Sequence, residues 1–360
     1  MKLATRILIG GSPCTYWSIA RGSNREVKTE GLGWELFRNY LIAKERFKPD
    51  FFLYENNSSA SKDIQNQIKN ELGGVLIHIN SSLVSAQNRK RFYVCNWDNV
   101  SPTERGVQLK DILETNKAVV ENEKSYCLMA GRTGNTRDYL KKHHSQIAFE
   151  PIKIGSISKK EGQANRVYSS YGKSVCLMGN GGGQGGHTGL YFTPLPQELV
   201  GLVCDKGKIY NVENGILFTK FGNFNVNLDD GLYLIRKLTI KECCRLQTLP
   251  DNYCDCPEVS NTQKYKGLGN GWTAEVIIHL LKEGLKNISR NEAIEVLSMY
   301  DGIGTGRYCF DKLGFKNITY KAYEIDKYAK QIAKYNYPDV VECGDAFDVR
   351  SDEWNYKLIN

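Results

Sequence analysis

A short apolar run near the start of the chain, which ends in a glycine turn and a cysteine, constrains the fold most. Residues 7–9 predict a buried strand, and the glycines at 10–11 end it. Pro13 fixes the backbone immediately before Cys14. Because open α/β sheets bind ligands at the carboxyl ends of their strands, a cysteine held there can serve as a nucleophile. A buried structural thiol is the alternative, and these residues alone favour it.

A second pattern, near the end of the chain, predicts a nucleotide-binding half. Residues 294–299 and 318–322 predict two strands, and the run Asp301-Gly302-Ile303-Gly304-Thr305-Gly306 between them predicts a loop that opens a helix. Glu324 lies 20 residues after Gly304, the spacing at which an acid reaches ribose hydroxyls. Asp345 follows a third strand, and its carboxylate suits an adenine amino group. Capping acids and glycines in an ordinary βαβ unit are the alternative.

Between these two units the regular pattern fades. Residues 51–54 predict a strand that delivers Glu55, and residues 75–79 and 92–94 predict two more strands. Residues 103–235 lose this periodicity and predict a smaller, loop-rich β domain. The glycine-rich run 179–189 fits a linker and a DNA-contacting loop equally well.

Composition bounds the partners and the compartment. The net charge of +8 fits a polyanionic partner without establishing one. No stretch approaches the ~20 apolar residues of a membrane span, and the N-terminus has no apolar signal region, so we expect a cytoplasmic protein without membrane contact. The eleven cysteines are scattered. Reduced thiols are favoured over a zinc site built from Cys243, Cys244, Cys254 and Cys256, because these spacings are too tight for the usual tetrahedral sites, and no metal is expected.

Taken together, the motifs resemble those of the DNA cytosine carbon-5 methyltransferase family. The resemblance is carried by Gly-Gly-Ser-Pro-Cys at 10–14, Tyr-Glu-Asn at 54–56, Gln-x-Arg-x-Arg at 87–91, Gly-Asn-Gly at 269–271 and the cofactor motifs at 301–306, 324 and 344–345. The Ser-Pro-Cys run and the residues around Gln87 look closest to the de novo branch of the family and its phage and bacterial relatives.

The resemblance implies an α/β fold, namely the Rossmann-like sheet of class I S-adenosylmethionine-dependent methyltransferases, with helices on both faces and a small β-rich target-recognition domain. The family's cofactor half normally comes first, whereas here it comes last, which implies a circular permutation. We expect residues 1–104 to form the catalytic half and residues 105–261 the target-recognition domain. Residues 262–360 would hold the closing helix, a linker and the cofactor-binding half.

The resemblance also implies roles for individual residues. Cys14 would attack carbon 6 of a flipped-out cytosine, Glu55 would bind its ring, and Arg89 and Arg91 would supply positive charge that favours the thiolate. The residues implied for S-adenosylmethionine are Pro13, Asn270, Trp272, Tyr300, Asp301, Gly302, Gly304, Thr305, Gly306, Glu324, Ile325, Asp345 and Ala346. Those expected to contact double-stranded DNA are Ser18, Arg21, Arg25, Gln87, Arg132, Arg137, Lys159, Lys160 and Arg166, for each of which a solvated surface charge or polar group is the alternative.

Three other functions remain open at this stage. A tRNA cytosine-5 methyltransferase would share the fold and the chemistry, but the roughly 130-residue middle region favours a DNA recognition domain. An inactive DNA-binding regulatory homologue would not need to retain Cys14, Glu55, Arg89 and Arg91, and a metabolic nucleotide methylase would not need a basic middle region. A cognate restriction endonuclease is a candidate partner. The sequence leaves the target site, the preference for hemimethylated DNA and the oligomeric state open.

Overall fold

The computed structural model describes residues 4–18, 23–114, 153–156, 166–168, 172–177, 190–194, 208–219, 222–225, 229–236 and 238–354. The expectations for Arg21, Arg132, Arg137, Lys159 and Lys160, and for the glycine-rich run 179–189, lie outside these residues. Within them, no helix is long and apolar enough to cross a bilayer.

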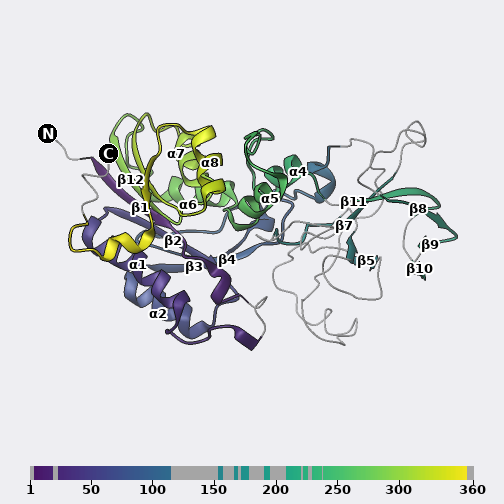
Figure 1. The fold of residues 1–360 in the computed structure, drawn as a ribbon, viewed down its shortest axis with the longest axis horizontal. Helices are drawn as coiled ribbons and strands as arrows, with labels where there is room; N and C mark the ends of the chain where they lie inside the picture. Colours follow the sequence, from purple (N-terminus) through teal and green to yellow (C-terminus); the bar gives the residue numbers. More distant parts are fainter. Residues whose placement is uncertain are drawn as a thin grey trace.

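A seven-stranded sheet organises one half of the molecule (Figure 1). Its order is β14 (Val341–Gly344), β13 (Asn317–Tyr323), β12 (Ala293–Met299), β1 (Thr5–Gly10), β2 (Phe51–Asn57), β4 (Lys90–Cys95) and β3 (Val75–Asn80). The strands from β14 to β2 run parallel, and β4 is antiparallel to both β2 and β3. Parallel neighbours need helical crossovers, which the alternating sequence pattern supplies. The expected Rossmann-like α/β sheet is confirmed.

Helices cover both faces of this sheet (Figure 1). Helices α1 (Leu32–Phe47) and α2 (Lys62–Leu72) pack on one face, and α4 (Ile240–Leu246), α5 (Asn261–Asn270), α6 (Ala274–Gly284), α7 (Thr305–Lys312) and α8 (Lys327–Asn336) lie on the other. Successive strand residues point to opposite faces, so Leu8 packs with α1 and α2 while Ile7 and Ile9 join the opposite core. Ser61 begins α2, since its Oγ accepts a hydrogen bond from the N–H of Ile64 at 3.3 Å.

The two ends of the chain belong to one sheet. The first strand, β1, pairs in parallel with β12, so the three C-terminal strands continue the sheet directly from the N-terminal strand. The guanidinium of Arg46, in α1, donates to the backbone oxygens of Val349 at 3.0 Å and Trp354 at 3.1 Å. The neighbouring Phe47 accepts a hydrogen bond from Arg6 through its carbonyl. The described ends of the chain therefore meet at the end of α1, as the expected circular permutation requires.

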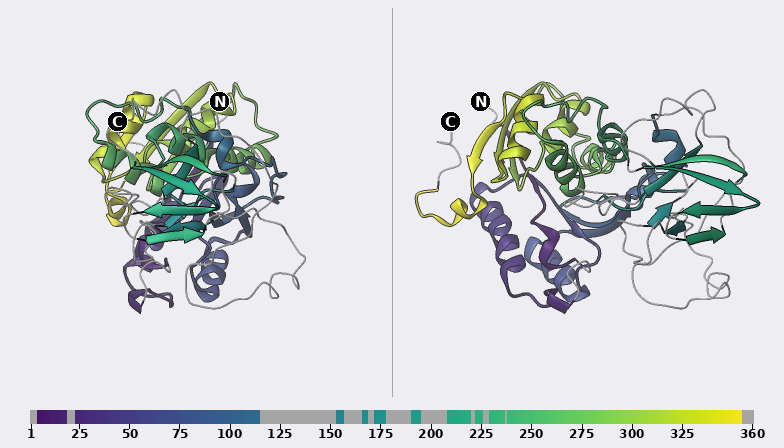
Figure 2. Two further views of the ribbon diagram at one scale, coloured as in Figure 1. Left: turned by 90° about the vertical axis from the view of Figure 1, so that its right-hand side faces the viewer. Right: turned by 45° about the vertical axis from the view of Figure 1, so that its right-hand side comes forward.

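A second sheet lies beyond the first (Figure 2). Its order is β10 (Gly222–Asn225), β9 (Ile216–Thr219), β8 (Lys208–Glu213), β11 (Gly231–Arg236), β7 (Leu190–Pro194), β6 (Arg166–Tyr168) and β5 (Lys153–Ser156). Asn214 and Gly215 both have positive φ, at 56° and 70°, which is why this Asn-Gly pair forms the tight turn between β8 and β9. The middle of the chain thus contains the expected β-rich region.

The segment after the second sheet packs with the first. Thr239 and Glu242 form a capping box that begins α4, and Cys243, Cys244 and Leu246 are fully buried in the core that covers the first sheet. The sequence placed residues 238–261 in the target-recognition domain. The described packing instead groups them with the first sheet, because their apolar side chains share its core.

Candidate active site

Two glycines let the chain turn from β1 to Cys14. A Cβ on Gly10 would lie 2.3 Å from the carbonyl oxygen of Met299, and one on Gly11 would lie 2.6 Å from the carbonyl oxygen of Glu55. Both distances are far below a normal contact, so only glycine lets this loop pass between β12 and β2. Cys14 opens the 3-10 turn η1 (Cys14–Tyr16) just beyond, where it is partly exposed.

A buried hydrogen-bond network fixes the loop before Cys14. The side-chain amide of Asn56 donates to the carbonyl of Ser12 at 2.9 Å and to the hydroxyl of Tyr54 at 3.0 Å, and the hydroxyls of Ser12 and Tyr54 lie 2.7 Å apart. Side chains alternate along β2, so Tyr54 and Asn56 face this loop together. The sequence analysis missed these positioning residues, although their run was visible as a motif.

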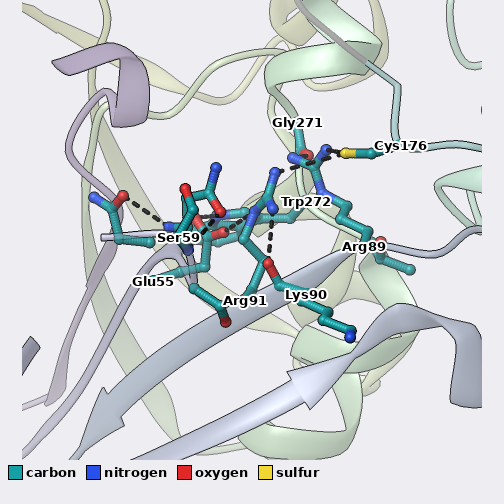
Figure 3. Close-up of polar contacts among 12 residues, drawn as sticks. Glu55, Ser59, Arg89, Lys90, Arg91, Cys176, Gly271 and Trp272 are labelled. Atoms are coloured by element: carbon teal, nitrogen blue, oxygen red, sulfur yellow. Dashed lines mark hydrogen bonds and ion pairs between the residues drawn. The ribbon is translucent and has the colours of Figure 1, made fainter. Parts of the chain in front are cut away.

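Glu55 is held between two donors on either side of its carboxylate (Figure 3). Arg91 Nε lies 3.0 Å from Oε1, and the indole N–H of Trp272 donates to Oε2 at 3.1 Å. The side chains of Glu55 and Arg91 are 12% and 9% exposed, so their ion pair is largely removed from water. Trp272 was expected to contact the cofactor. Its hydrogen bond also orients the carboxylate of Glu55, which was expected to bind the cytosine ring.

Arg89 joins three segments through its guanidinium (Figure 3). It donates to the backbone oxygens of Gly271 at 2.8 Å, Gly269 at 3.2 Å and Leu177 at 3.3 Å, and to Cys176 Sγ at 3.3 Å. It is 4% exposed. Arg89, which immediately precedes β4, therefore joins this strand to the C-terminal end of α5 and to the segment 172–177.

The pKa of Cys14 reflects competition between burial and charge. Burial raises the pKa of the Cys14 thiol above its usual value, while Arg91 and Arg89 lower it and Glu55 raises it further. The arginines favour the thiolate as expected, and burial outweighs them in this structure. The thiol is therefore protonated at neutral pH.

One cavity of about 480 Å³ runs from Cys14 and Glu55 to the ends of the C-terminal strands. At its far end, Glu324 Oε2 accepts from the backbone N–H of Gly302 at 2.8 Å, and Oε1 accepts from Ile325 at 2.9 Å and Asp326 at 2.8 Å. These backbone donors hold the carboxylate in place beside the cavity. The volume is that of a small-molecule site.

Most residues expected at the cofactor line this cavity. They are Pro13, Asn270, Trp272, Tyr300, Asp301, Gly302, Thr305, Glu324, Ile325, Asp345 and Ala346. Gly304 and Gly306 do not line it. A Cβ on Gly304 would lie 3.0 Å from Ala333 and one on Gly306 would lie 2.3 Å from the Tyr320 hydroxyl, so both glycines serve helix packing instead.

The motifs alone could not predict the exposure, backbone strain and pKa of the residues at the Glu324 end of the cavity. Ile325 is 72% exposed and Phe347 38% exposed, and both line the cavity as apolar walls suited to a flat ring. Tyr300 has a positive φ of 61°, a strained backbone for a tyrosine, and its hydroxyl donates to the carbonyl of Leu36 at 2.7 Å. Burial raises the pKa of Asp301 to about 6. Phe347 was missed because it lies beyond the last cofactor motif.

The structure describes four of the residues that are expected to contact DNA, and they differ in exposure. Gln87 is fully buried and bridged to Ser174 through its backbone, so it is not part of the exposed surface, and its contact with DNA stays a prediction. Ser18, Arg25 and Arg166 are partly exposed, and Arg25 donates to the backbone oxygen of Ser59.

In the described ranges, no group of three or more His, Cys, Asp or Glu side chains could hold a metal ion. The four cysteines weighed as zinc ligands are buried thiols.

The strand order, the helices on both faces and the cavity at the carboxyl ends of the strands define an α/β class I methyltransferase. The chain belongs to the C-5 cytosine-specific DNA methylase family, whose model matches residues 2–286. The match ends before β12, which a permuted cofactor half predicts, because a linear model cannot follow a segment that has moved to the other end.

Similar proteins include one by sequence and two by structure. The chain is 25% identical over 303 residues to the type II methyltransferase M.HhaI of Haemophilus parahaemolyticus, which covers 78% of this chain and 75% of that protein. A triple-alanine variant of Spodoptera frugiperda DNMT2 aligns with 16% identity and a TM-score of 0.41, over 77% of this chain and 78% of that one. A DNA modification methyltransferase encoded within an E. coli prophage aligns with 15% identity and a TM-score of 0.39, over 78% of both chains.

Proposed function

We propose that this protein is a DNA cytosine-5 methyltransferase with Cys14 as its nucleophile and S-adenosylmethionine as its methyl donor. One observation carries the proposal: a single cavity contains Cys14 and Glu55 near one end and Glu324 and Asp345 at the other. A nucleophile and a nucleoside-binding site that share one cavity bring a base and a methyl group together without further movement of the fold.

The residues near Cys14 suit the activation of cytosine. Carbon 5 of cytosine is a poor nucleophile until a thiol has added at carbon 6. Cys14 Sγ makes that addition, the thiol proton is lost to water as the bond forms, and ring N3 takes up a proton to neutralise the electron pair that the addition pushes onto the ring. Glu55 accepts from the exocyclic amine and from ring N3 once that nitrogen has taken up a proton, and Arg91 and Trp272 hold its carboxylate for that contact. Once carbon 5 has taken the methyl group, its proton is lost to water, and the electrons of that C–H bond re-form the ring double bond and break the bond between carbon 6 and Cys14 Sγ.

The far end of the cavity fits the methyl donor. When bound there, S-adenosylmethionine supplies an electrophilic methyl group. Glu324 would bind its ribose hydroxyls, and the exposed apolar side chains of Ile325 and Phe347 would pack against its adenine. Asp345 Oδ1 accepts from the backbone N–H of Phe347 at 2.9 Å, and Oδ2 would accept from the adenine amino group.

The substrate is inferred to be duplex DNA. The family to which the chain belongs is named for DNA, M.HhaI is a type II methyltransferase, and the net charge is +8. A cytosine inside a duplex cannot reach Cys14, so the base must be flipped out of the stack. Residues 105–261 would contain the domain that recognises the target, with the second sheet as its framework.

Transfer of a tritiated methyl group to duplex DNA, to tRNA and to free nucleotide tests the substrate. We expect label in duplex DNA with the wild-type protein and none with Cys14→Ser, because a hydroxyl is a weak nucleophile without activation. Cys343→Ser serves as the control, since Cys343 is also a partly exposed thiol. DNA that contains 5-fluorocytosine should trap the wild-type protein through Cys14. Label in tRNA alone, or trapping through another cysteine, would overturn the proposal.

A further inference from the structure

The segment 172–177, from the middle of the chain, forms a wall of the catalytic end. The N–H of Ser174 donates to the carbonyl of Ala86 at 2.6 Å, and the N–H of Asn88 donates to the carbonyl of Ser174 at 3.1 Å. Lys173 is fully buried, and its ammonium group donates to the backbone oxygens of Ser82, Ser85 and Val107. The segment is therefore fixed against the Gln-x-Arg-x-Arg run.

This docking brings a second thiol to the two arginines of that run (Figure 3). Cys176 Sγ lies 3.3 Å from a guanidinium nitrogen of Arg89 and 4.0 Å from one of Arg91. The arginines are only 4% and 8% exposed. No motif predicted this contact, because Cys176 lies 87 residues from Arg89 in the sequence.

The two buried arginines beside Cys176 carry one more positive charge than the one carboxylate paired with them neutralises. Arg91 pairs with Glu55, whereas Arg89 has no ion pair with any carboxylate in the part of the chain that the structure describes. Among the described residues, the other titratable groups that act on these cations are Cys14 and Tyr93, and burial raises the pKa of both above their ordinary values, so both are protonated at neutral pH. Buried cations are stabilised by an anion within contact distance. A thiolate at Cys176 would supply it.

The pKa values of the partly exposed cysteines also favour a thiolate at Cys176 over one at Cys14 or Cys343. Burial raises the pKa of Cys176, but Arg89 and Arg91 outweigh it, so the pKa is lowered from its ordinary value. Burial raises the pKa of Cys343 to about 11 and also raises that of Cys14. These three are the partly exposed thiols among the described residues. The thiolate is the reactive form of a cysteine, so Cys176 should be the most reactive of the three.

We propose that Cys176 is a modification site, a thiol activated by Arg89 and Arg91 that hydroperoxides oxidise, and that its oxidation stops methyl transfer. In the reaction, the thiolate sulfur attacks one peroxide oxygen, the O–O bond breaks, and hydroxide leaves and takes up a proton to become water. Sulfur loses two electrons, the peroxide gains them, and Cys176 becomes a sulfenic acid.

Oxidation would change the charge that holds the catalytic end together. A sulfenic acid adds an oxygen atom between the segment 172–177 and the guanidiniums, and it removes the thiolate charge that pairs with Arg89. Arg91, which also holds Glu55, lies on the same sulfur. The effect on turnover rests on the proposed function, whereas the reactivity of Cys176 does not.

Peptide mapping by mass spectrometry tests the reactivity. The wild-type protein is exposed to a limiting amount of hydrogen peroxide near neutral pH, and sulfenic acids are captured with dimedone. We expect capture at Cys176 to exceed capture at Cys14 and at Cys343 by about tenfold or more. Equal or faster capture at Cys343 would overturn the proposal, whether or not the protein transfers methyl groups.

Activity after peroxide treatment tests the consequence. Wild-type methyl transfer should be lost and should return on treatment with a thiol reductant. Cys176→Ser lacks the thiolate and should start from a lower rate than wild type, but the fraction of its own untreated rate that survives peroxide should persist at least about tenfold longer than in wild type. Cys343→Ser, the matched control, should behave as wild type. Loss of activity in Cys176→Ser at the wild-type rate would show that Cys176 is not the switch. If no variant transfers methyl groups to any substrate, the proposed function fails, and the mapping still decides the reactivity of Cys176.

Discussion

Replacement of Gly11 by alanine should separate the stability of the fold from the geometry of the site. A Cβ at this position would lie 2.6 Å from the carbonyl oxygen of Glu55 and 2.8 Å from its Oε2. Relief of the first contact to 3.4 Å requires a shift of about 0.8 Å in Glu55 or in the loop before Cys14. Overpacking of this size costs about 1–3 kcal/mol of stability. A displacement near 1 Å at reacting groups lowers the rate by about a hundredfold.

Gly73→Ala is the matched control. Gly73 ends α2 with a φ of +63°, and no atom lies within 4 Å of the position of its Cβ. This variant should lose about 1 kcal/mol of stability through backbone strain alone and keep its full rate. Urea denaturation measures the first quantity, and methyl transfer to duplex DNA at saturating substrates measures the second. A Gly11→Ala protein with a kcat near that of wild type would refute the close contact between Cys14's loop and Glu55.

Four further outcomes are expected. Trp272→Phe removes the donor to Glu55 Oε2 but keeps the ring, so kcat should fall by about tenfold, equivalent to about 1.4 kcal/mol, while urea denaturation stays unchanged. Asp301 has its pKa raised by burial to about 6, above the ordinary 3.8, so the folded state binds its proton more tightly than the unfolded state. Its contribution to stability is therefore present below about pH 4 and lost as the pH rises to about 6, by about 3 kcal/mol, and urea titrations of Asp301→Asn should lack this loss. Glu324→Ala should weaken the binding of S-adenosylmethionine by about 1–3 kcal/mol in calorimetry, and unchanged binding would exclude this end of the cavity as the cofactor site. A rearranged chain that starts at Asn291, joins Asn360 to Met1 through a short Gly/Ser linker and ends at Lys286 should fold and methylate within about tenfold of the parent rate, whereas inactivity at several linker lengths would contradict the permutation.

The sequence by itself determined the elements and their order. Apolar runs at 7–9 and 51–54 became β1 and β2, and the alternation of strands and helices gave the α/β sheet. Ser61 and Asp326 begin α2 and α8, because their side-chain oxygens accept backbone N–H groups of the first turn. The permuted order of the motifs predicted that the C-terminal strands join the N-terminal strand, and β12 pairs with β1. These features follow from local periodicity and capping, which neighbouring residues encode.

The tertiary structure alone decided which groups meet in the site. Arg89 contacts Gly271, 182 residues away, and Cys176 reaches both arginines from a segment without a clear pattern. Gln87 belongs to the motif of Arg89 yet is fully buried, and Gly306 belongs to the cofactor loop yet packs against Tyr320. Such contacts depend on how distant segments pack, and a side chain's burial and charge environment exist only after that packing. For this reason the sequence named Cys14 as the nucleophile, while only the fold revealed that burial keeps its thiol protonated.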